Sequence, residues 1–309
     1  MSEAHVYDMI IVGGGPGGYT AAIYAASAGL DTLVLEKLSA GGQMALSEEI
    51  NNYPGFEEGV DGYTLAEKMQ RQAERFGART VYAEVERMEL AAEPKVLETS
   101  EGVFYARTVA LATGAGPREL GLADEAELVG RGVAYCAACD GMRYRGKTVV
   151  VVGGGNSAAG DALALSRIAE KVILVHRRDK LRATKAYDRP LSQAGNIEFR
   201  WNSAVVELLH GDKLSGVRLR DVNTGEETEL ACDGVFISVG RKPAAELVKG
   251  QLELDKNGYI AADETTKTSL PGVYAVGDVR TKALRQVVTA VADGAAAVHM
   301  AEEYLAGGE

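Results

Sequence analysis

The chain has little of what marks a secreted or membrane protein. Three cysteines in 309 residues are too few for the disulfide framework of a small secreted domain, so we expect a reducing, cytoplasmic setting. No apolar run approaches the ~20 residues that a membrane-spanning helix needs. The opening letters MSEAHVYDMIIVGGG contain acidic side chains and no basic segment, which argues against a signal peptide.

Positive charge is also in short supply. The chain has 33 Lys and Arg against 44 Asp and Glu, a net charge of −11, which argues against nucleic acid or an anionic membrane as a general partner. What remains is typical of a globular protein, with 46% hydrophobic and 25% charged residues, and the length suits about two domains.

A strand, glycine turn, helix and second strand occur twice, 140 residues apart. The first copy reads YDMIIV, GGGPGG, TAAIYAASAG and DTLVL, and the second reads KTVVVV, GGGNSA, AGDALALSRIA and KVILV. In this context the first glycine makes a tight turn, the second admits a pyrophosphate, and the third small residue lets helix and strand pack closely. Two structural glycine turns would fit this repeated context less well, so we predict two dinucleotide sites. Their motif positions are Gly13, Gly15, Pro16 and Gly18 in the first copy, and Gly153, Gly155, Asn156, Ser157 and Ala158 in the second.

The residue that follows the second strand of each copy differs. It is Glu36 in the first copy, and a carboxylate there accepts hydrogen bonds from ribose hydroxyls, as suits FAD or NAD. In the second copy it is His176, followed by Arg177 and Arg178, with Arg182 one turn on. These cations suit a 2′-phosphate, although basic runs are also common on surfaces. We therefore predict FAD at the first site and NADPH at the second.

Later strands indicate the domain boundaries. Residues 108–114 and 234–240 are typical of buried strands that run into glycine turns, and residues 271–278 add a strand ending at an acidic residue. No further complete copy follows. We predict an α/β protein with two Rossmann-like domains, in which an NADPH domain at 117–243 is inserted into an FAD domain made of 1–116 and 244–309.

The segment AYCAACDG places Cys136 three residues before Cys139. The pair alone is compatible with a metal clip, a structural bridge or a redox couple. A structural zinc site needs four protein ligands, yet the histidines show no pair at ligand spacing and Cys232 lies far along the chain, so we predict no metal site. Thiols at this spacing can have pKa values lowered from ~8.5 toward ~7, which makes thiolate available at neutral pH. Cys232 is predicted to open a strand, buried or half-buried, without a catalytic role.

The ordered set GGGPGG, GGQM, NNYPGF, ATGA, CAACDG, GGGNSA, HRRDKLRA, GVFISVG, GDV and RQVVTAVADG resembles the low-molecular-weight thioredoxin reductases along nearly the whole chain. Dihydrolipoamide dehydrogenase-like relatives instead carry early cysteines and a further dimerisation domain. The resemblance implies that electrons pass from NADPH to FAD, then to Cys136 and Cys139, and finally to a thioredoxin disulfide. It implies that Cys139 faces the flavin and that Asp140 protonates the departing thiolate, although Asp140 could instead cap a helix.

The same resemblance implies further cofactor contacts, a homodimer, and a rotation of the inserted domain. The hinges are expected at Gly116-Pro117 and Lys242-Pro243. Several of the polar positions could alternatively cap turns or helices. The expected contacts are Gly42, Gln43, Asn52, Val85, Thr113, Gly114, Asp278, Arg285, Gln286 and Val287 for FAD, and Ile237 for the nicotinamide nucleotide.

Three positions depart from the family pattern. Gly160-Asp161 replaces a pair of acids near the expected nicotinamide, Met142-Arg143 stands where the family has aromatic residues for partner docking, and Asn51 replaces an acid. Two alternatives therefore stay open. The first is an oxidoreductase of the same fold that uses another partner or electron donor. The second is a redox sensor that binds FAD and NADPH but has little turnover.

Overall fold

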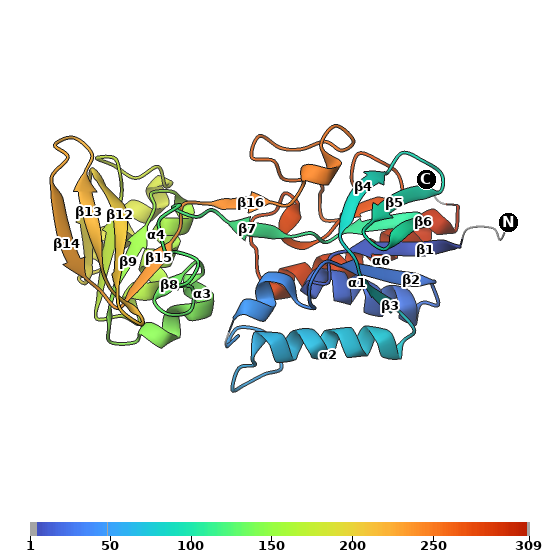
Figure 1. Cartoon of the computed structure of the whole chain (residues 1–309), viewed down its shortest axis with the longest axis horizontal. Helices are drawn as coiled ribbons and strands as arrows, with labels where there is room; N and C mark the ends of the chain where they lie inside the picture. Colours follow the sequence, from blue (N-terminus) through green and yellow to red (C-terminus); the bar gives the residue numbers. More distant parts are fainter. Residues whose placement is uncertain (1–4, 48, 308–309) are drawn as a thin grey trace. The chain divides into compact units, whose positions relative to one another are not determined.

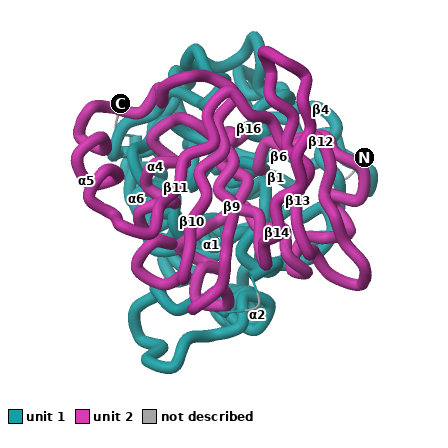
Figure 2. The backbone as a smooth tube through the Cα atoms, turned by 90° about the vertical axis from the view of Figure 1, so that its left-hand side faces the viewer, with its two compact units in different colours: residues 1–116, 242–309 teal, residues 117–241 magenta. Residues whose placement is uncertain are grey.

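The computed structural model describes residues 5–47 and 49–307. The first four residues of the segment that was examined for a signal peptide lie outside this described part. Two compact units divide the chain (Figure 2). Unit 1 comprises residues 1–116 and 242–309, and unit 2 comprises residues 117–241. The second boundary falls two residues before the predicted start at 244. Two short strands, β7 (Ala115–Pro117) and β16 (Arg241–Pro243), pair with each other where the chain passes between the units.

Unit 1 is built on a sheet of seven strands among its described residues, in the order β3-β2-β1-β6-β5-β4, with β17 also paired to β6 (Figure 1). The strand bounds are β1 Val6–Val12, β2 Thr32–Glu36, β3 Arg79–Tyr82, β4 Val85–Glu89, β5 Lys95–Thr99, β6 Gly102–Leu111 and β17 Val273–Ala275. The long strand β6 pairs in parallel with β1 and β17 and antiparallel with β5. A Rossmann-like parallel sheet and an antiparallel meander thus share one strand.

Helices α1 (Pro16–Ser27), α2 (Gly62–Arg75) and α6 (Val287–Leu305) cover one face of this sheet. Small residues let α1 and α6 approach closely, because a Cβ on Gly294 would lie 2.4 Å from the carbonyl oxygen of Gly17. This explains the alanine- and glycine-rich composition of both helices. The 3-10 turns of unit 1 are η1 (Gly42–Leu46), η4 (Glu246–Val248) and η5 (Gly277–Val279).

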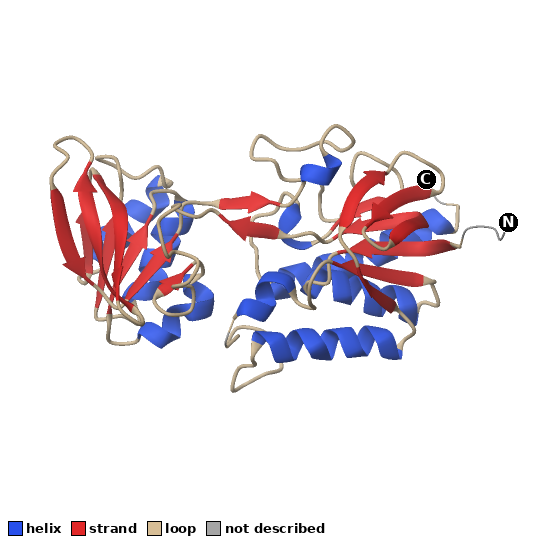
Figure 3. Cartoon of the chain, in the orientation of Figure 1, coloured by secondary structure: helices blue, strands red, loops and turns tan. Residues whose placement is uncertain are grey.

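Unit 2 has three layers. Its parallel sheet, in the order β11-β10-β9-β15-β8, lies between helices on one face and a three-stranded antiparallel sheet, β12-β13-β14, on the other (Figure 3). Strand β9 alternates accordingly, with Val149 and Val151 toward the helices and Val150 and Val152 toward the antiparallel sheet. The strand bounds are β8 Val133–Ala134, β9 Thr148–Val152, β10 Lys171–Val175, β11 Ile197–Arg200, β12 Ser203–His210, β13 Leu214–Asp221, β14 Glu227–Ala231 and β15 Gly234–Ile237. The helical segments are α3 Ala137–Asp140, η2 Gly141–Tyr144, α4 Asn156–Ser166, η3 Lys185–Tyr187 and α5 Asp188–Gln193.

The predicted α/β class with two Rossmann-like sheets is confirmed. Each glycine turn joins a first strand to its helix, β1 to α1 and β9 to α4, and a parallel second strand follows in both copies. The sheet β12-β13-β14 was not predicted. Within the described residues, no helix combines the length and apolar character that a membrane crossing requires.

Candidate active site

The first glycine turn lies between β1 and α1 in unit 1. Gly13 has a positive φ of 105°, and a Cβ there would meet the carbonyl oxygen of Ala112 at 2.5 Å. A Cβ on Gly18 would meet the carbonyl oxygen of Gly13 at 1.9 Å, so both positions require glycine. A Cβ on Gly15 would meet no heavy atom within 4 Å. The space in front of Gly15, before Pro16 at the start of α1, is open to a ligand.

Glu36, at the end of β2, is joined to this turn. One carboxylate oxygen accepts a hydrogen bond from Gly14 N at 2.6 Å, and the other accepts from Leu38 N at 3.2 Å. The predicted ribose-binding carboxylate therefore also fixes the glycine loop, a contact that the sequence did not reveal. Val85, at the start of β4, is buried.

The segment that begins η1 folds against the same loop. Gly41 N donates to the carbonyl oxygen of Gly14 at 2.7 Å, and a Cβ on Gly42 would lie 3.9 Å from the Cα of Gly15. Gly42 has a positive φ of 53°, and Gln43 is exposed. Glycine positions 15 and 42 thus face one another across a space without side chains, which fits the pyrophosphate of a dinucleotide.

Residues far apart in sequence meet at the start of α6. Gln286 is the N-cap of α6 and forms a capping box with Thr289, and its side-chain oxygen accepts a hydrogen bond from Asn52 Nδ2 at 2.9 Å. Val287 is the first residue of this helix. Arg285 stacks its guanidinium over the ring of Tyr259 at 4.0 Å.

Three further predicted positions follow the sheet strands of unit 1. Thr113 donates through Oγ1 to the carbonyl oxygen of Ala244 at 2.6 Å, and Gly114 accepts from Ala244 N. Asp278 lies in η5, directly after β17, and its backbone carbonyl accepts from Arg285 Nε. The structure therefore places three of the predicted FAD positions, Gly13, Thr113 and Asp278, just after the ends of the parallel strands β1, β6 and β17, where open sheets place their ligands.

The second glycine turn, in unit 2, repeats this geometry. A Cβ on Gly153 would meet the carbonyl oxygen of Ser238 at 2.4 Å and the Cβ of Ala158 at 2.8 Å, whereas a Cβ on Gly155 would meet nothing within 4 Å. Asn156 begins α4, and its side-chain oxygen accepts from Thr184 N at 2.8 Å. Ser157 is exposed, and Ile237 is buried at the end of β15.

His176 is placed differently from the arginines that follow it. Its side chain is buried, and its ring occupies the space that a Cβ on Gly154 would need, with ring atoms 2.1–2.4 Å from that position. Burial and the positive charges of Arg182, Arg178 and Arg177 lower the pKa of His176. The ring is therefore neutral at pH 7 and supports the glycine loop instead of adding a positive charge. His176 Nε2 is buried without a hydrogen-bond partner among the described residues.

The three arginines are exposed, and no hydrogen bond or ion pair with another described residue engages their guanidinium groups. Arg182 N donates to the carbonyl oxygen of Gly154 at 2.6 Å, so the basic segment folds back over the glycine loop. The cationic set at this site is thus Arg177, Arg178 and Arg182.

The buried His176 gives a prediction about pH. Its folded pKa lies below the ordinary value of 6.5, so the unfolded chain binds more protons, and its contribution to stability is complete above pH 6.5 and is lost as the pH falls through the folded pKa. We expect the stability of the wild-type protein to fall between pH 7.5 and 5.5 by more than that of His176→Asn, by at most about 1.4 kcal/mol per pH unit. Urea unfolding at both pH values measures the difference. An equal decline in both proteins would show that protonation of His176 does not oppose folding.

Cys136 and Cys139 form a disulfide at the start of α3, with their Cα atoms 5.3 Å apart. Cys136 is the N-cap of α3, and its sulfur accepts from Cys139 N at 3.2 Å. Asp140 ends α3, and its side chain does not cap the following turn η2. Both cysteines and Asp140 are partly exposed, so the disulfide is within reach of another molecule.

A contact network that the sequence did not reveal holds the strand before the disulfide. The carboxylate of Glu125, which is 3% exposed, accepts from the backbone amides of Leu120, Gly121 and Leu122, and it also accepts from Tyr135 Oη at 2.8 Å. Tyr135 directly precedes Cys136. A buried acid and a tyrosine hydroxyl therefore fix the approach to the redox pair.

Cys232 is buried as predicted, but it lies between β14 and β15 and does not open a strand. Burial raises the pKa of its thiol to about 12, so it is an unreactive thiol near neutral pH. The described residues contain no group of three or more His, Cys, Asp or Glu side chains arranged to hold a metal ion.

Of the departures from the family pattern, Gly160 lies in α4, where a Cβ would come no closer than 3.8 Å to Tyr187. Its neighbour Asp161 accepts a hydrogen bond from Ser238 Oγ, and burial raises the pKa of this carboxyl despite that bond and the charge of Arg241. Met142 is exposed in η2, and Arg143 donates to the carbonyl oxygen of Gly130. The structure offers no account of Asn51.

A fold with two Rossmann-like units, one of which also carries a CxxC disulfide, defines a disulfide oxidoreductase of the nucleotide-dependent class. The family model "Pyridine nucleotide-disulphide oxidoreductase" matches residues 7–294. The thioredoxin reductase of Treponema pallidum is 44% identical over 97% of this chain and 97% of its own length, and that of Bacillus subtilis is 42% identical over 99% and 96%. The crystal structure of thioredoxin reductase from Streptococcus pyogenes MGAS5005 is 42% identical, covers 98% of this chain and 99% of its own, and gives a TM-score of 0.88. The chain therefore belongs to the pyridine nucleotide-disulphide oxidoreductase family and, within it, to the thioredoxin reductases. Membership in this family implies FAD and NAD(P)H as cofactors.

Proposed function

We propose that unit 1 binds FAD, that unit 2 binds NADPH, and that Cys136 and Cys139 reduce the disulfide of a thioredoxin. The net reaction converts NADPH, one proton and a thioredoxin disulfide into NADP⁺ and a thioredoxin dithiol. The observation that carries the proposal is the Cys136–Cys139 disulfide on the same unit as a glycine turn flanked by exposed arginines.

The residues of unit 1 fit FAD. The open space before Gly15 and Gly42 admits a diphosphate at the N-terminus of α1, and Glu36, which is bonded to Gly14 N, is proposed to accept hydrogen bonds from the ribose hydroxyls. Asp278, Asn52 and the segment from Arg285 to Val287 are proposed to contact the flavin side. When bound, FAD accepts a hydride from NADPH and supplies two electrons to the disulfide.

In unit 2, the space before Gly155 admits the NADPH diphosphate, and Arg177, Arg178 and Arg182 pair with its 2′-phosphate. The buried ring of His176 packs against Gly154 and supports the backbone of the glycine loop. Gly160 has no side chain, so on α4 we propose Asp161 as the carboxyl group near the nicotinamide. The hydrogen bond from Ser238 holds the Asp161 carboxyl at the end of β15.

The cysteines carry the second half of the reaction. We assign Cys139 to the flavin side and Cys136 to attack on thioredoxin. Two electrons cleave the Cys136–Cys139 bond, Cys139 keeps the negative charge, and Asp140 protonates the departing Cys136 thiolate. Asp140 takes this proton back as Cys136 attacks the thioredoxin disulfide, and it passes the proton to the thioredoxin sulfur that leaves. The Cys139 thiolate then resolves the mixed disulfide, which regenerates the Cys136–Cys139 bond, and the second thioredoxin sulfur takes its proton from solvent.

Both the disulfide and the NADPH site belong to unit 2, so we infer that this unit presents them to FAD in turn. The connecting segments around Gly116-Pro117 and Lys242-Pro243 are the proposed hinges, because they are the two crossings between the units. A homodimer and a cytoplasmic location stay predictions.

The visible spectrum of the purified protein tests the cofactor assignment. We expect a yellow protein that releases FAD, and not FMN, on denaturation, because the loop at Gly13–Gly18 and Glu36 fit a diphosphate and an adenosine ribose. Anaerobic titration should bleach the flavin with NADPH at lower concentrations than with NADH. A colourless protein that takes up no FAD would overturn the assignment of unit 1.

A further inference from the structure

The chain contains a single tryptophan, and this residue lies beside the basic segment of unit 2. Trp201 directly follows β11, which pairs in parallel with β10 so that Arg200 lies opposite Val175. His176 directly follows β10. Trp201 and His176 therefore occupy equivalent positions, just beyond the carboxyl ends of two neighbouring parallel strands. This is the edge of the sheet where such folds bind nucleotides.

Backbone hydrogen bonds hold the chain on both sides of Trp201 against the basic segment. On the side that precedes Trp201, the carbonyl oxygen of Arg200 accepts from His176 N at 2.9 Å. On the side that follows it, Asn202 N donates to the carbonyl oxygen of Arg178 at 3.2 Å. The position of Trp201 relative to the arginines is thus fixed by the same backbone contacts that shape the basic segment.

The side chain of Trp201 forms a supported, flat surface. Its indole stacks on the ring of Phe199, with centroids 4.9 Å apart and an angle of 9° between the planes. The ring of His176 lies 6.5 Å away in an edge-to-face arrangement, and it also packs against Gly154 of the glycine loop. Trp201 is partly exposed, and its indole N–H donates to no other described residue. A rigid aromatic side chain with accessible surface therefore stands next to the proposed NADPH loop.

The covalent structure of NADPH brings its adenine to this place. The 2′-phosphate and the adenine are attached to adjacent carbons of one ribose. A nucleotide whose 2′-phosphate pairs with Arg177 and Arg178 therefore carries its adenine to the same edge of the sheet, where Trp201 lies. Aromatic side chains bind bases by stacking on their π-faces, and this contact does not require a charge.

We propose that Trp201 is the surface on which the adenine ring of the nicotinamide nucleotide stacks. The inference rests on the proposed binding of NADPH by unit 2. Arg177 and Arg178 select NADPH through its 2′-phosphate, whereas Trp201 binds the adenine that NADPH and NADH share. Trp201 is thus a binding residue for both nucleotides and takes no part in hydride transfer.

The single tryptophan allows a direct test on the unaltered holoprotein, because all tryptophan emission comes from Trp201. The emission is titrated with adenosine 2′,5′-bisphosphate, which carries the adenine and the 2′-phosphate but no nicotinamide. We expect saturable quenching, with a dissociation constant equal to the inhibition constant of this compound against NADPH. Nicotinamide mononucleotide, which lacks adenine, should leave the emission unchanged.

Variants measure the contribution of Trp201 to binding. Trp201→Ala should raise the Michaelis constants for NADPH and for NADH alike, by about tenfold, because it removes the stacking surface but no charge. The kcat values should stay unchanged. Trp201→Phe keeps an aromatic ring and should restore most of the affinity. Tyr63→Ala, at an exposed tyrosine of unit 1, is the matched control and should change neither Michaelis constant.

Two results would overturn the inference. If adenosine 2′,5′-bisphosphate competes with NADPH while the emission of Trp201 stays constant, the adenine binds elsewhere. If Trp201→Ala affects NADPH alone, or neither nucleotide, Trp201 supports the arginines or the fold and does not bind adenine. Failure of the proposed function gives a different result, in which the wild-type protein oxidises neither nucleotide and adenosine 2′,5′-bisphosphate does not bind.

Discussion

Replacing either Cys136 or Cys139 with serine is expected to abolish thioredoxin reduction, with at least a thousandfold loss of turnover that reflects the missing thiolate, while FAD remains bound and is still reduced by NADPH. The reason is that each sulfur has a separate task, one taking electrons from the flavin side and the other attacking the partner disulfide. Steady-state reduction of thioredoxin and anaerobic bleaching of the flavin measure the two halves of the reaction separately.

Cys232→Ala is the matched control for this pair. The Cys232 thiol is buried with a raised pKa, so the variant should reduce thioredoxin at the wild-type rate. Substantial thioredoxin reduction by Cys136→Ser or Cys139→Ser would show that electrons leave the protein by a path other than the disulfide.

The double variant Arg177→Ala/Arg178→Ala is expected to raise the Michaelis constant for NADPH far more than that for NADH. Loss of a charge-assisted hydrogen bond to phosphate costs about 1.5–3 kcal/mol, or roughly tenfold or more in affinity per arginine. NADH has no 2′-phosphate, so it loses no such bond. Steady-state kinetics with the two nucleotides measure the ratio.

Arg189→Ala provides the control, because Arg189 is an exposed arginine of the same unit that lies outside the basic segment. It should leave both Michaelis constants unchanged. An equal effect of the double variant on NADPH and NADH would mean that Arg177 and Arg178 are structural. If the wild-type protein barely reacts with either nucleotide, the electrons enter from another donor.

The repeated part of the fold was predictable because it depends on local signals. Strand, glycine turn and helix follow one another within about thirty residues in such a unit, and hydrophobic patterns specify them directly. The sheet β12-β13-β14 was missed because its strands are half exposed and contain both charged and apolar residues. In β13, for example, Arg218 and Arg220 alternate with apolar residues. Long-range pairing, such as β6 with β17, is absent from any local window.

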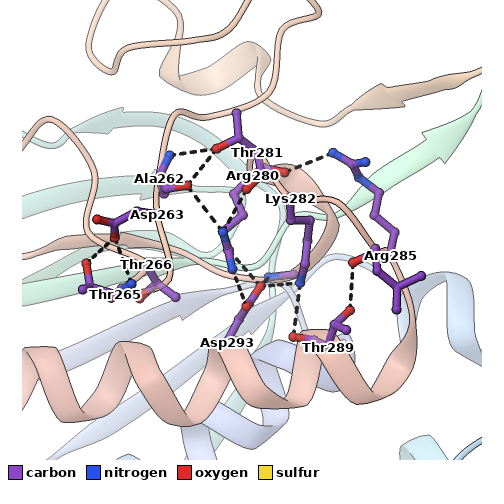
Figure 4. Close-up of polar contacts among 12 residues, drawn as sticks. Ala262, Asp263, Thr265, Thr266, Arg280, Thr281, Lys282, Arg285, Thr289 and Asp293 are labelled. Carbon is purple, nitrogen blue, oxygen red and sulfur yellow. Dashed lines mark hydrogen bonds and ion pairs between the residues drawn. The ribbon is translucent and has the colours of Figure 1, made fainter. Parts of the chain in front are cut away.

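The site was predictable in its residue types more than in its contacts. The sequence named Glu36, but it could not show that this carboxylate also binds the amide of Gly14. It grouped His176 with the arginines, whereas burial against Gly154 makes the ring neutral. The buried contacts of Asp293 with Arg280 and Lys282 could not be predicted, because these side chains meet only after η5 and α6 pack together (Figure 4). These contacts depend on tertiary packing.

The most direct test of the proposed electron path is the steady-state consumption of NADPH by the purified protein in the presence of excess oxidised thioredoxin. We predict sustained turnover, with one thioredoxin dithiol formed for each NADPH oxidised and no consumption above background when thioredoxin is omitted. A single reductive event that stops after one equivalent of NADPH per protein, with thioredoxin still oxidised, would contradict this account and identify the protein as a sensor of redox state.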